Sequence, residues 1–495
     1  MFFFCVIPFM IATSVVVSDI TDDDSKGKNT ESSWIDDFSV TSTGGVAVTD
    51  NPTCSQIAAD VLSEGGNAVD AAVAAALCLG VVSPASSGLG GGCFILSYNA
   101  STGESYFIDS RETAPALATE NMFVDDPLKA QWGGLAVAIP AELRGLYHAW
   151  DKSGGGVSWH RVVEPAAALA NRWQISEAEA TYIAAFFRSK DTYYDLYPDI
   201  FDMYSDRKGN PKKEGDYVQN PALSQTLYNI ADQGPDYLYS TMAATLAQEI
   251  QDAGGIVSTN DITSYTPVER DVMKAEVWGH TFLGAPPPSS GGLTIIAILQ
   301  YIAGYTEPVA SLGDLYYHRL LEGMKHAFAI RMSLGDPDFV NITDPVNDVL
   351  YNGIMDSLRQ NSSDSGVLPN VSDYGGEKYG PVFQPEDHGT SHLTIIDKDG
   401  NAVALTSTIN TYFGSGVMSA STGIVFNNEM DDFSIPNASN AFGLAPFTTN
   451  YVEPGKRPLS SMSPTIVTRT NSEKVRVVGG ASGGPRIITA TVQVL

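Results

Sequence analysis

The sequence predicts a folded α/β protein whose C-terminal part is rich in strands. Between residues 44 and 332, short strand-like runs alternate with helical patterns. From Thr390 onward, β-branched and apolar residues recur in short segments separated by turn residues. Of the 495 residues, 43% are hydrophobic and 17% are charged, which is typical of globular rather than disordered chains. This length suits one large domain or two ordinary ones.

The chain is strongly acidic, with 28 Lys and Arg against 57 Asp and Glu, which gives a net charge of −29. Such a surface repels nucleic acids and anionic membranes, so the charge argues against both as partners. This excess of acidic residues favours a soluble protein of an extracytoplasmic space.

The N-terminus predicts an entry signal for the secretory route. Residues 1–17 are apolar and are followed by an acidic, polar stretch over residues 18–40. We interpret the first segment as a signal peptide, with a membrane anchor as the alternative, and the second as a flexible stalk. The expected location is therefore extracellular, cell-surface or vacuolar. Glycosylation sequons, which are modestly suggestive of that route, begin at Asn99, Asn341, Asn361, Asn370 and Asn437.

Two predicted helices carry a cysteine pair. The runs "CSQIAADVLSEGG" and "NAVDAAVAAALCLG" indicate helices joined at Gly65-Gly66, with Thr53 as the expected N-cap. If the helices are antiparallel, Cys54 meets Cys78 because both lie 12 residues from Gly66. We predict a disulfide here; two buried free cysteines are the alternative in a cytosolic protein. No Cys-x-x-Cys or HExxH motif occurs and the histidines are scattered, so we expect neither a metal nor a cofactor.

The remaining elements follow from periodicity and turn residues. Strands are expected at 44–49, in a hairpin over 91–110, and at "GIVFNNEM" (423–430), "SPTIVTRT" and "KVRVVGG"; helices are expected near 141–153, 159–172, 237–253, 293–304, 314–332 and at the terminal "RIITATVQVL". Residues 356–389 are polar and rich in Pro, Gly and Ser, which predicts an exposed, loosely structured segment.

The stretch "HGTSHLTIIDKDGNAVALTSTIN" (388–410) predicts a β-hairpin with two facing threonines. Residues 391–396 and 402–408 have strand patterns, and Gly400 suits the left-handed position of the turn between them. In the expected register, paired positions place Thr390 directly across from Thr408. By spacing alone, two threonines on a sheet are an ordinary structural feature.

Four further segments suggest chemistry, each of them weakly. The glycines of "SSGLGGGCF" (86–94) lead into a strand without a nearby lysine, which favours close backbone packing over phosphate binding. "NNEMDDFS" (427–434) holds Glu429, Asp431 and Asp432 without a nearby cation, so it is either a site for a cationic ligand or metal, or a solvated acidic turn. "RPLSSMSPT" places two hydroxyls before a strand, and "GGASGGPRI" offers N–H groups to an anion or oxyanion.

Taken in order, these motifs resemble the gamma-glutamyltranspeptidase (glutathione hydrolase) family of N-terminal-nucleophile hydrolases. The resemblance runs from about residue 44 to the end and is strongest at "GGNAVDAAVAAALCLGVVSPASSGLGGG", "DSRETAP", "GDPDFVN", the 388–410 hairpin, "FGSGVMSASTGIVFNNEMDDFS" and "PLSSMSPTI". It implies a four-layer αββα sandwich in which a large subunit (41–389) and a small subunit (390–495) arise by self-cleavage between Gly389 and Thr390. The family's disulfide in animal members matches the Cys54–Cys78 spacing. The small subunit is shorter than in the family, which implies an incomplete C-terminal part.

The resemblance also implies roles for individual residues. Thr390 is the expected nucleophile, with its freed α-amine as general base, and Thr408 is expected to hydrogen-bond its hydroxyl. Backbone N–H groups of Gly483 and Gly484 are expected to form the oxyanion hole. Two further sets are expected to hold the substrate: Arg111, Ser460 and Ser461 at its α-carboxylate, and Asn410, Glu429 and Asp432 at its α-ammonium.

The expected activity is transfer of the γ-glutamyl group of glutathione, or of another γ-glutamyl compound, to water, an amino acid or a dipeptide. Two alternatives remain open. One is an unprocessed, truncated family member without catalysis, and the other is a related γ-glutamyl acylase or poly-γ-glutamate hydrolase.

Overall fold

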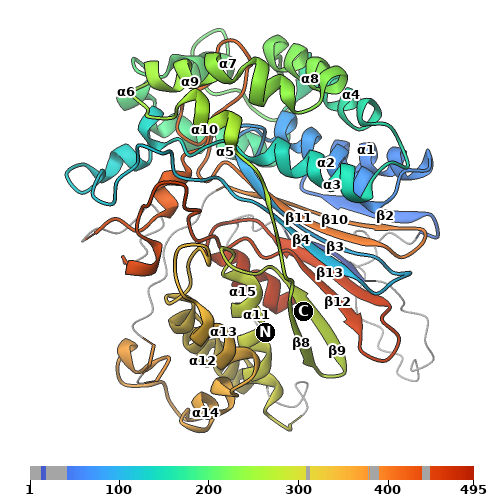
Figure 1. The fold of residues 1–495 in the computed structure, drawn as a ribbon, viewed down its shortest axis with the longest axis vertical. Coiled ribbons are helices and arrows are strands. Elements are labelled where there is room, and N and C mark those ends of the chain that lie inside the picture. The colour runs from blue at the N-terminus through green and yellow to red at the C-terminus, as the bar shows by residue number, and fades with distance from the viewer. Residues whose placement is uncertain (1–12, 18–41, 308–312, 377, 380–388, 437–445) are drawn as a thin grey trace.

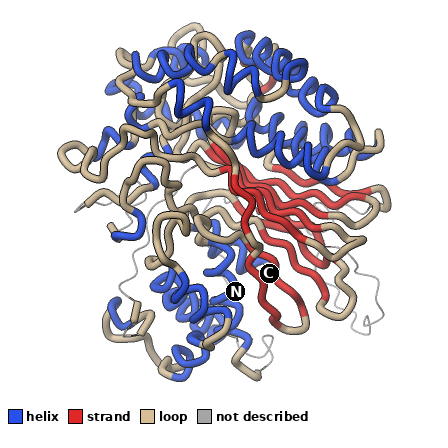
Figure 2. Tube along the Cα trace, in the orientation of Figure 1, coloured by secondary structure: helices blue, strands red, loops and turns tan. Residues whose placement is uncertain are grey.

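A computed structural model describes residues 13–17, 42–307, 313–376, 378–379, 389–436 and 446–495. Two antiparallel sheets pack face to face, and helices cover the outer face of each (Figures 1 and 2). One apolar cluster lies between the two sheets, and larger clusters lie between each sheet and its helices. The predicted four-layer αββα sandwich is therefore confirmed.

Among the residues described, the first sheet contains six strands and the second contains five. Across the first sheet the order is β2 (Gly45–Thr49), β10 (Ser391–Asp397), β11 (Ala402–Thr408), β3 (Gly92–Tyr98), β4 (Ser105–Ser110) and β7 (Val268–Arg270). Across the second it is β1 (Thr13–Val17), β13 (Val475–Ala481), β12 (Thr465–Arg469), β9 (His280–Gly284) and β8 (Met273–Val277). A short separate pair joins β5 (Trp173–Gln174) to β6 (Tyr217–Val218).

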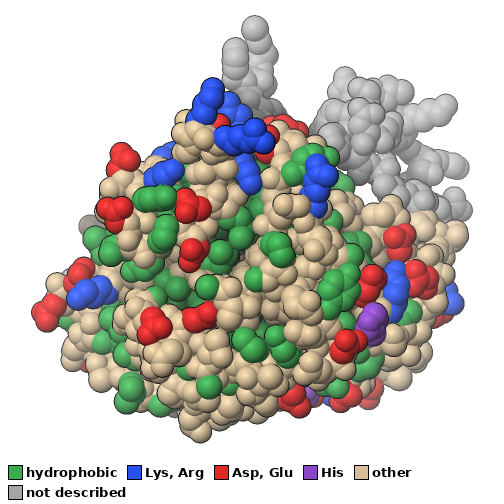
Figure 3. Space-filling model, turned by 90° about the horizontal axis from the view of Figure 1, so that it is seen from above, with side chains coloured by type: hydrophobic (Ala, Val, Ile, Leu, Met, Phe, Trp, Pro, Cys, Tyr) green, Lys and Arg blue, Asp and Glu red, His purple; other side chains and the backbone are tan. Residues whose placement is uncertain are grey.

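The two helical layers differ in size. Over the first sheet lie α1 (Pro52–Ser63), α2 (Ala68–Val82), α3 (Glu142–Ser153), α4 (Trp159–Ala170), α5 (Glu177–Phe186), α6 (Lys190–Tyr193), α7 (Pro198–Met203), α8 (Pro221–Gln233), α9 (Ala243–Asp252) and α10 (Thr259–Ser264). Beside the second lie α11 (Gly291–Ala303), α12 (Asp314–Arg331), α13 (Thr343–Leu350), α14 (Ile354–Gln360) and α15 (Arg486–Val494). On the outer face of the first layer, Asp and Glu side chains are scattered in small groups (Figure 3).

Helices α1 and α2 form the predicted antiparallel pair, and Cys54 and Cys78 form the predicted disulfide with their Cα atoms 5.4 Å apart. Asn67 caps α2 in a capping box with Asp70. The prediction of Thr53 as the N-cap of α1 is wrong. Asn51 takes that position, because its side chain accepts from the Thr53 N–H and Pro52 occupies the first helical turn.

The β10–β11 hairpin has the predicted register, with Ser391 opposite Ser407 and Ile396 opposite Ala402. Side chains alternate between the two layers. Leu393 and Leu405 pack under the helices, whereas Ile396 and Ala404 lie between the sheets. Both strands are buried on both faces, so a slip of one residue would exchange these two sets.

Several expected elements differ in the structure. Residues 423–430 are not a strand: they contain one isolated bridge at Val425 and then enter a 3-10 turn, Glu429–Asp432, because buried polar side chains bond the local backbone there. The expected helix over 237–253 is a π-turn (Tyr237–Thr241) followed by α9.

The segment 356–389 is also more ordered than predicted. Helix α14 extends to Gln360, and the rings of Tyr374 and Tyr379 are buried in an apolar cluster with residues of α12, α13 and α14. The polar composition of the segment did not indicate this burial. Residues 380–388 lie outside the described part of the chain.

The N-terminal run Thr13–Val17, predicted within a signal peptide or anchor, pairs with the edge of β13 as strand β1. Its role as an entry signal stays a prediction, as do the stalk over residues 18–40, which lies outside the described residues, and the division at 389/390. Among the residues described, no helix combines the length and apolarity needed to span a bilayer.

Candidate active site

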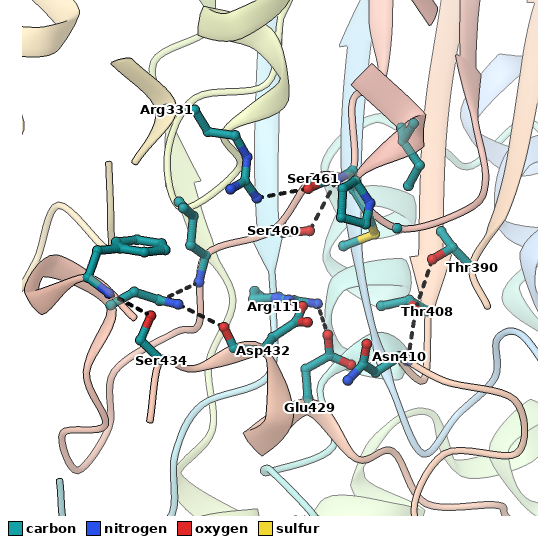
Figure 4. Close-up of a pocket in the computed structure, with 17 residues that line it drawn as sticks. Arg111, Arg331, Thr390, Thr408, Asn410, Glu429, Asp432, Ser434, Ser460 and Ser461 are labelled. Atoms are coloured by element: carbon teal, nitrogen blue, oxygen red, sulfur yellow. Dashed lines mark hydrogen bonds and ion pairs between the residues drawn. The ribbon is translucent and has the colours of Figure 1, made fainter. Parts of the chain in front are cut away.

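Thr390 and Thr408 face one another at the end of the β10–β11 hairpin. Their hydroxyl oxygens are 3.2 Å apart, and both residues are buried. The Thr408 oxygen also accepts a hydrogen bond of 2.9 Å from the backbone N–H of Asn410. This bond occupies a lone pair of Thr408 and leaves its proton free for the Thr390 oxygen. The pair therefore sits as the hairpin register predicts (Figure 4).

The backbone around Thr390 is unusual. Thr390 has φ of 78°, a region that β-branched residues rarely adopt, and Gly389 before it has φ of 87°. A Cβ on Gly389 would lie 1.8 Å from the carbonyl oxygen of Asn410, so only glycine fits. The bond predicted to be cut is thus held in a strained, tightly enclosed conformation.

The glycines of residues 90–92 pack closely against the backbone behind the threonine pair. A Cβ on Gly91 would lie 1.9 Å from the Thr408 carbonyl oxygen, and one on Gly90 would lie 2.0 Å from that of Val425. The predicted close backbone packing at this motif is confirmed, and it brings β3 and the 423–428 segment against the hairpin.

Arg111 lies opposite the threonines and pairs with Glu429 and Asp432 through separate guanidinium nitrogens (Figure 4). The expectation that these carboxylates lack a nearby cation is wrong, because the fold brings together residues more than 300 positions apart. Burial alone would lower the pKa of Arg111, but its carboxylate neighbours hold that pKa above the usual value. Burial raises the pKa of Glu429, and the Arg111 guanidinium opposes this rise.

Asp431, the third acid of this segment, is fully buried but does not line the cavity. Asn410, predicted with Glu429 and Asp432 at the ammonium site, does line it and donates from its side chain to the carbonyl of Asn428, 3.0 Å away.

Ser460 and Ser461 lie beside Arg111 and also line the cavity. The Ser460 oxygen accepts from the Met462 N–H at 3.1 Å. The Ser461 oxygen accepts from Nη2 of Arg331 at 2.9 Å. Sequence reasoning missed Arg331, the last residue of α12, although it is an arginine within an otherwise apolar stretch, "HAFAIRM".

Gly483 and Gly484 form the turn between β13 and α15. Both have positive φ, 118° and 47°, and their carbonyls accept from the N–H groups of Arg486 and Ile487 at the start of α15. Gly484 lines the cavity and Gly483 precedes it. Their role as oxyanion donors stays a prediction.

A single cavity collects most of the predicted residues. Its lining includes Thr390, Thr408, Asn410, Arg111, Glu429, Asp432, Ser460, Ser461 and Gly484, together with the unpredicted Arg331, Ser434, Phe447 and Asn450. The last two follow residues 437–445, which lie outside the described part of the chain. Within the described ranges, no cluster of three or more His, Cys, Asp or Glu side chains is arranged to hold a metal ion.

The charges of this cavity match those of an α-amino acid. The Arg111 guanidinium and two hydroxyls can hold a carboxylate, while two carboxylates and an amide oxygen can hold an ammonium group. The threonine pair lies to one side of both sets (Figure 4). A side-chain carbonyl extending from a bound amino acid would therefore point toward Thr390.

Comparisons with known proteins agree with this geometry. The gamma-glutamyltranspeptidase family model matches residues 54–495. Glutathione hydrolase 2 of Arabidopsis thaliana is 45% identical over 462 residues, which cover 91% of this chain and 76% of that protein. Cephalosporin acylase from Bacillus halodurans has the same fold, with a TM-score of 0.79 at 23% identity over 96% of this chain and 83% of that chain. Gamma-glutamyltranspeptidase of Helicobacter pylori has a TM-score of 0.63 at 29% identity over 69% of this chain and 98% of that chain. The chain belongs to the gamma-glutamyltranspeptidase family.

Proposed function

We propose that the protein cleaves the γ-glutamyl amide bond of glutathione and related compounds. It transfers the γ-glutamyl group to water, and also to amino acid or dipeptide acceptors. The observation that carries this proposal is the cavity in which Thr390 lies beside separate groups for a carboxylate and for an ammonium ion. Holding both α-groups leaves the γ-carbonyl at Thr390, so γ-amides react and ordinary α-peptides do not.

The nucleophile first has to be released by self-cleavage. The Thr390 hydroxyl oxygen attacks the Gly389 carbonyl carbon and the C–N bond breaks. The leaving nitrogen takes the proton of the hydroxyl and becomes a free α-amine. Water then hydrolyses the resulting ester and releases the Gly389 carboxylate. Support comes from the conformation at this bond, since both residues have positive φ and the space around Gly389 leaves no room for a Cβ.

Turnover then uses the same threonine. An α-amine has a pKa of about 7.7–8.0, so that of Thr390 can take the proton of its own hydroxyl near neutral pH. The oxygen attacks the γ-carbonyl and forms an ester, and the departing amine, cysteinylglycine in the case of glutathione, takes that proton. In this proposal the N–H groups of Gly483 and Gly484 donate to the developing oxyanion, and the proposal is supported by Gly484 lining the cavity. Water or an amine then attacks the ester and frees Thr390.

Export from the cytosol is part of the proposal. It is supported by the Cys54–Cys78 disulfide, because such bonds persist in oxidising compartments. It is also supported by the sequon residues Asn99, Asn341, Asn361 and Asn370, which are all exposed. Whether the apolar N-terminus is removed or retained as an anchor distinguishes a secreted form from a membrane-bound one.

Intact mass and N-terminal sequencing of the purified protein test self-cleavage. We expect two chains, the smaller beginning at Thr390-Ser391-His392. Thr390→Ala should stay uncut and inactive, whereas the matched Thr390→Ser should be cut and retain turnover. Full processing of Thr390→Ala would overturn the assignment of the nucleophile. An uncut wild-type chain would favour the non-catalytic alternative.

Dye release from p-nitroanilides tests the substrate class. The γ-glutamyl anilide should be cleaved far faster than the glutaryl anilide, which has the same acyl chain without the α-amino group. Equal rates, or a faster glutaryl substrate, would favour the acylase alternative. The two anilides differ only in the group that Glu429 and Asp432 are proposed to bind, so the comparison tests that contact directly.

A further inference from the structure

Arg331 is a buried cation at the rim of the cavity, and the proposed chemistry does not yet use it. It ends helix α12 and is 2% exposed. Its Nε donates to the Ser290 hydroxyl at 2.8 Å and its Nη2 donates to the Ser461 hydroxyl at 2.9 Å. Its Nη1 is buried and has no hydrogen-bond partner among the residues that the structure describes. Figure 4 shows the guanidinium reaching the cavity from the side opposite Arg111.

The charge of Arg331 is not neutralised within the described part of the chain. Asp432, a carboxylate whose charge acts on Arg331, pairs with Arg111 instead. Burial lowers the pKa of Arg331 to about 10, opposed by the charge of Asp432, so the group remains a cation at neutral pH. A buried cation held only by two hydroxyls is unfavourable unless a ligand supplies the missing negative charge.

The two arginines of the cavity differ in how their donors are used. Nη1 and Nη2 of Arg111 are bonded to Glu429 and Asp432, and its Nε donates to the Pro458 carbonyl. Among the residues that the structure describes, Arg331 has one unused donor and no carboxylate partner. Within that part of the chain, therefore, Arg331 rather than Arg111 carries the uncompensated positive charge.

The hydrogen bonds of Arg331 also determine how the serine hydroxyls point. Arginine has no acceptor, so the Ser461 oxygen must accept from Arg331, which leaves the Ser461 proton free to be donated. Ser290 accepts from Arg331 in the same way and donates to the Ser460 carbonyl at 2.7 Å, which holds the Ser460–Ser461 backbone. The Ser460 oxygen accepts from Met462, so its proton is free as well.

We propose that Arg331 is a positioning residue of the α-carboxylate site. Through its bonds to Ser290 and Ser461, it orients the hydroxyls of Ser460 and Ser461 toward the carboxylate of an α-amino acid ligand. It also supplies a second positive charge behind these hydroxyls. The inference rests on the proposed function for the identity of the ligand as a γ-glutamyl compound. It goes beyond that function in assigning carboxylate recognition to two arginines with different tasks.

The test compares two substrates that differ only in the carboxylate. These are the γ-glutamyl p-nitroanilide and the 4-aminobutyryl p-nitroanilide, in which hydrogen replaces the α-carboxylate. Arg331→Met should lower kcat/KM for the first by about 10- to 100-fold, mainly through KM, and change that for the second by less than about twofold. Arg331→Lys, which keeps the charge but not the forked geometry, should fall between wild type and Arg331→Met.

Arg319→Met is the matched control, because Arg319 is another buried arginine of α12 but pairs with Asp364 and Glu307 away from the cavity. It should leave the ratio of the two substrates unchanged. An equal loss on both substrates in Arg331→Met would overturn the inference and show a merely structural role. If Arg331→Met does not fold, Arg331→Lys and Ser290→Ala give the same ratio with smaller expected changes.

A double-mutant cycle tests the route through Ser461. If Arg331 acts by orienting that hydroxyl, Arg331→Met should cost several-fold less in a Ser461→Ala background than in wild type. Full additivity would overturn this part of the inference.

Calorimetric titration with L-glutamate separates this inference from the proposed function. If wild type releases no dye from the γ-glutamyl anilide, the proposed function fails, whereas Arg331 is still tested by the Kd of L-glutamate. That Kd should rise about tenfold or more in Arg331→Met and remain unchanged in Arg319→Met. An unchanged Kd in Arg331→Met would overturn the inference whether or not the proposed function holds.

Discussion

The hydroxyl oxygen of Thr408 lies 3.2 Å from that of Thr390 and accepts a bond from the Asn410 N–H at 2.9 Å. Because the Thr408 oxygen accepts from a backbone N–H, the Thr408 hydroxyl proton can be donated to the Thr390 oxygen. When Thr390 gives up its proton, the developing negative charge faces a donor that is already in place. Such a donor requires no reorganisation during the reaction, which is the condition under which a hydrogen bond accelerates catalysis.

Thr408→Val should lower kcat for the γ-glutamyl anilide by about 10²- to 10³-fold with little change in KM, because the lost bond strengthens only as charge develops. Valine keeps the shape and β-branching of threonine, so the sheet should stay intact. Thr408→Ser keeps the hydroxyl and should remain within about tenfold of wild type. Steady-state kinetics of purified, processed protein check this, and a kcat for Thr408→Val within threefold of wild type would contradict it.

Gly389→Ala should block or greatly slow self-cleavage. A Cβ at this position would lie 1.8 Å from the Asn410 carbonyl oxygen, and φ is 87°. The displaced backbone would move the Gly389 carbonyl away from the Thr390 hydroxyl, and a shift of about 1 Å can cost 10²-fold in rate. The fraction of split chain over time, measured by denaturing electrophoresis, checks the expectation.

Gly400→Ala is the control for that experiment. Gly400 also has positive φ, 83°, but a Cβ there would lie 3.4 Å from Ala100 Cβ, in the hairpin turn at the far end of β10. It should lower the free energy of unfolding by about 1 kcal/mol and leave splitting unaffected. Equal slowing in both variants would indicate that general destabilisation, rather than the geometry at Gly389, controls cleavage.

The local pattern of the sequence predicted the hairpin and its contacts well. Period-two alternation and the Asp397–Asn401 turn residues set the register, and the register alone placed Thr390 across from Thr408. The disulfide followed in the same way from two helices of similar length about one turn. Both relationships join residues close in sequence, for which turn geometry determines the partner.

Contacts between distant segments were not predictable in this way. The sequence could not show that Arg111 pairs with Glu429, since 318 positions separate them and the partner depends on how both sheets pack. Arg331 lies in no motif that the sequence analysis recognised, and its contacts are with Ser290 and Ser461 from two other segments. The segment 423–430 was mistaken for a strand because Ile424 and Phe426 are buried in the core as strand residues would be. Among the described residues, however, its backbone forms only one isolated bridge, between Val425 and Met418.

Arg111→Met should destabilise the fold by about 3–5 kcal/mol, because it leaves the buried Glu429 carboxylate without its cation. Arg111→Lys keeps the charge and should cost less, while losing the separate contacts to Glu429 and Asp432. Urea unfolding of an uncut Thr390→Ala background measures this without interference from processing. Adding Glu429→Gln to Arg111→Met should recover part of the loss, and failure to recover any would contradict the ion-pair interpretation.

Glu179 should make the protein less stable at alkaline pH. It lies in α5 and is fully buried, and the backbone of Ala85 offsets the cost of burying its charge only in part. Burial raises the pKa of Glu179 from 4.5 to about 8. The folded state therefore holds this proton more tightly than the unfolded chain, so the stabilisation is complete below pH 4.5 and is lost as the pH rises through 8.

Between pH 5 and pH 8.5, the free energy of unfolding of Glu179→Gln should consequently decrease less than that of wild type, by on the order of a few kcal/mol. The remaining slope should reflect Glu112 and Glu142, whose pKa values burial also raises, to about 8 and about 7. Glu177→Gln, on the exposed face of the same helix, is the control and should follow wild type. Urea midpoints measured across this pH range decide the matter: parallel curves for wild type and Glu179→Gln would mean that Glu179 titrates normally in the folded protein.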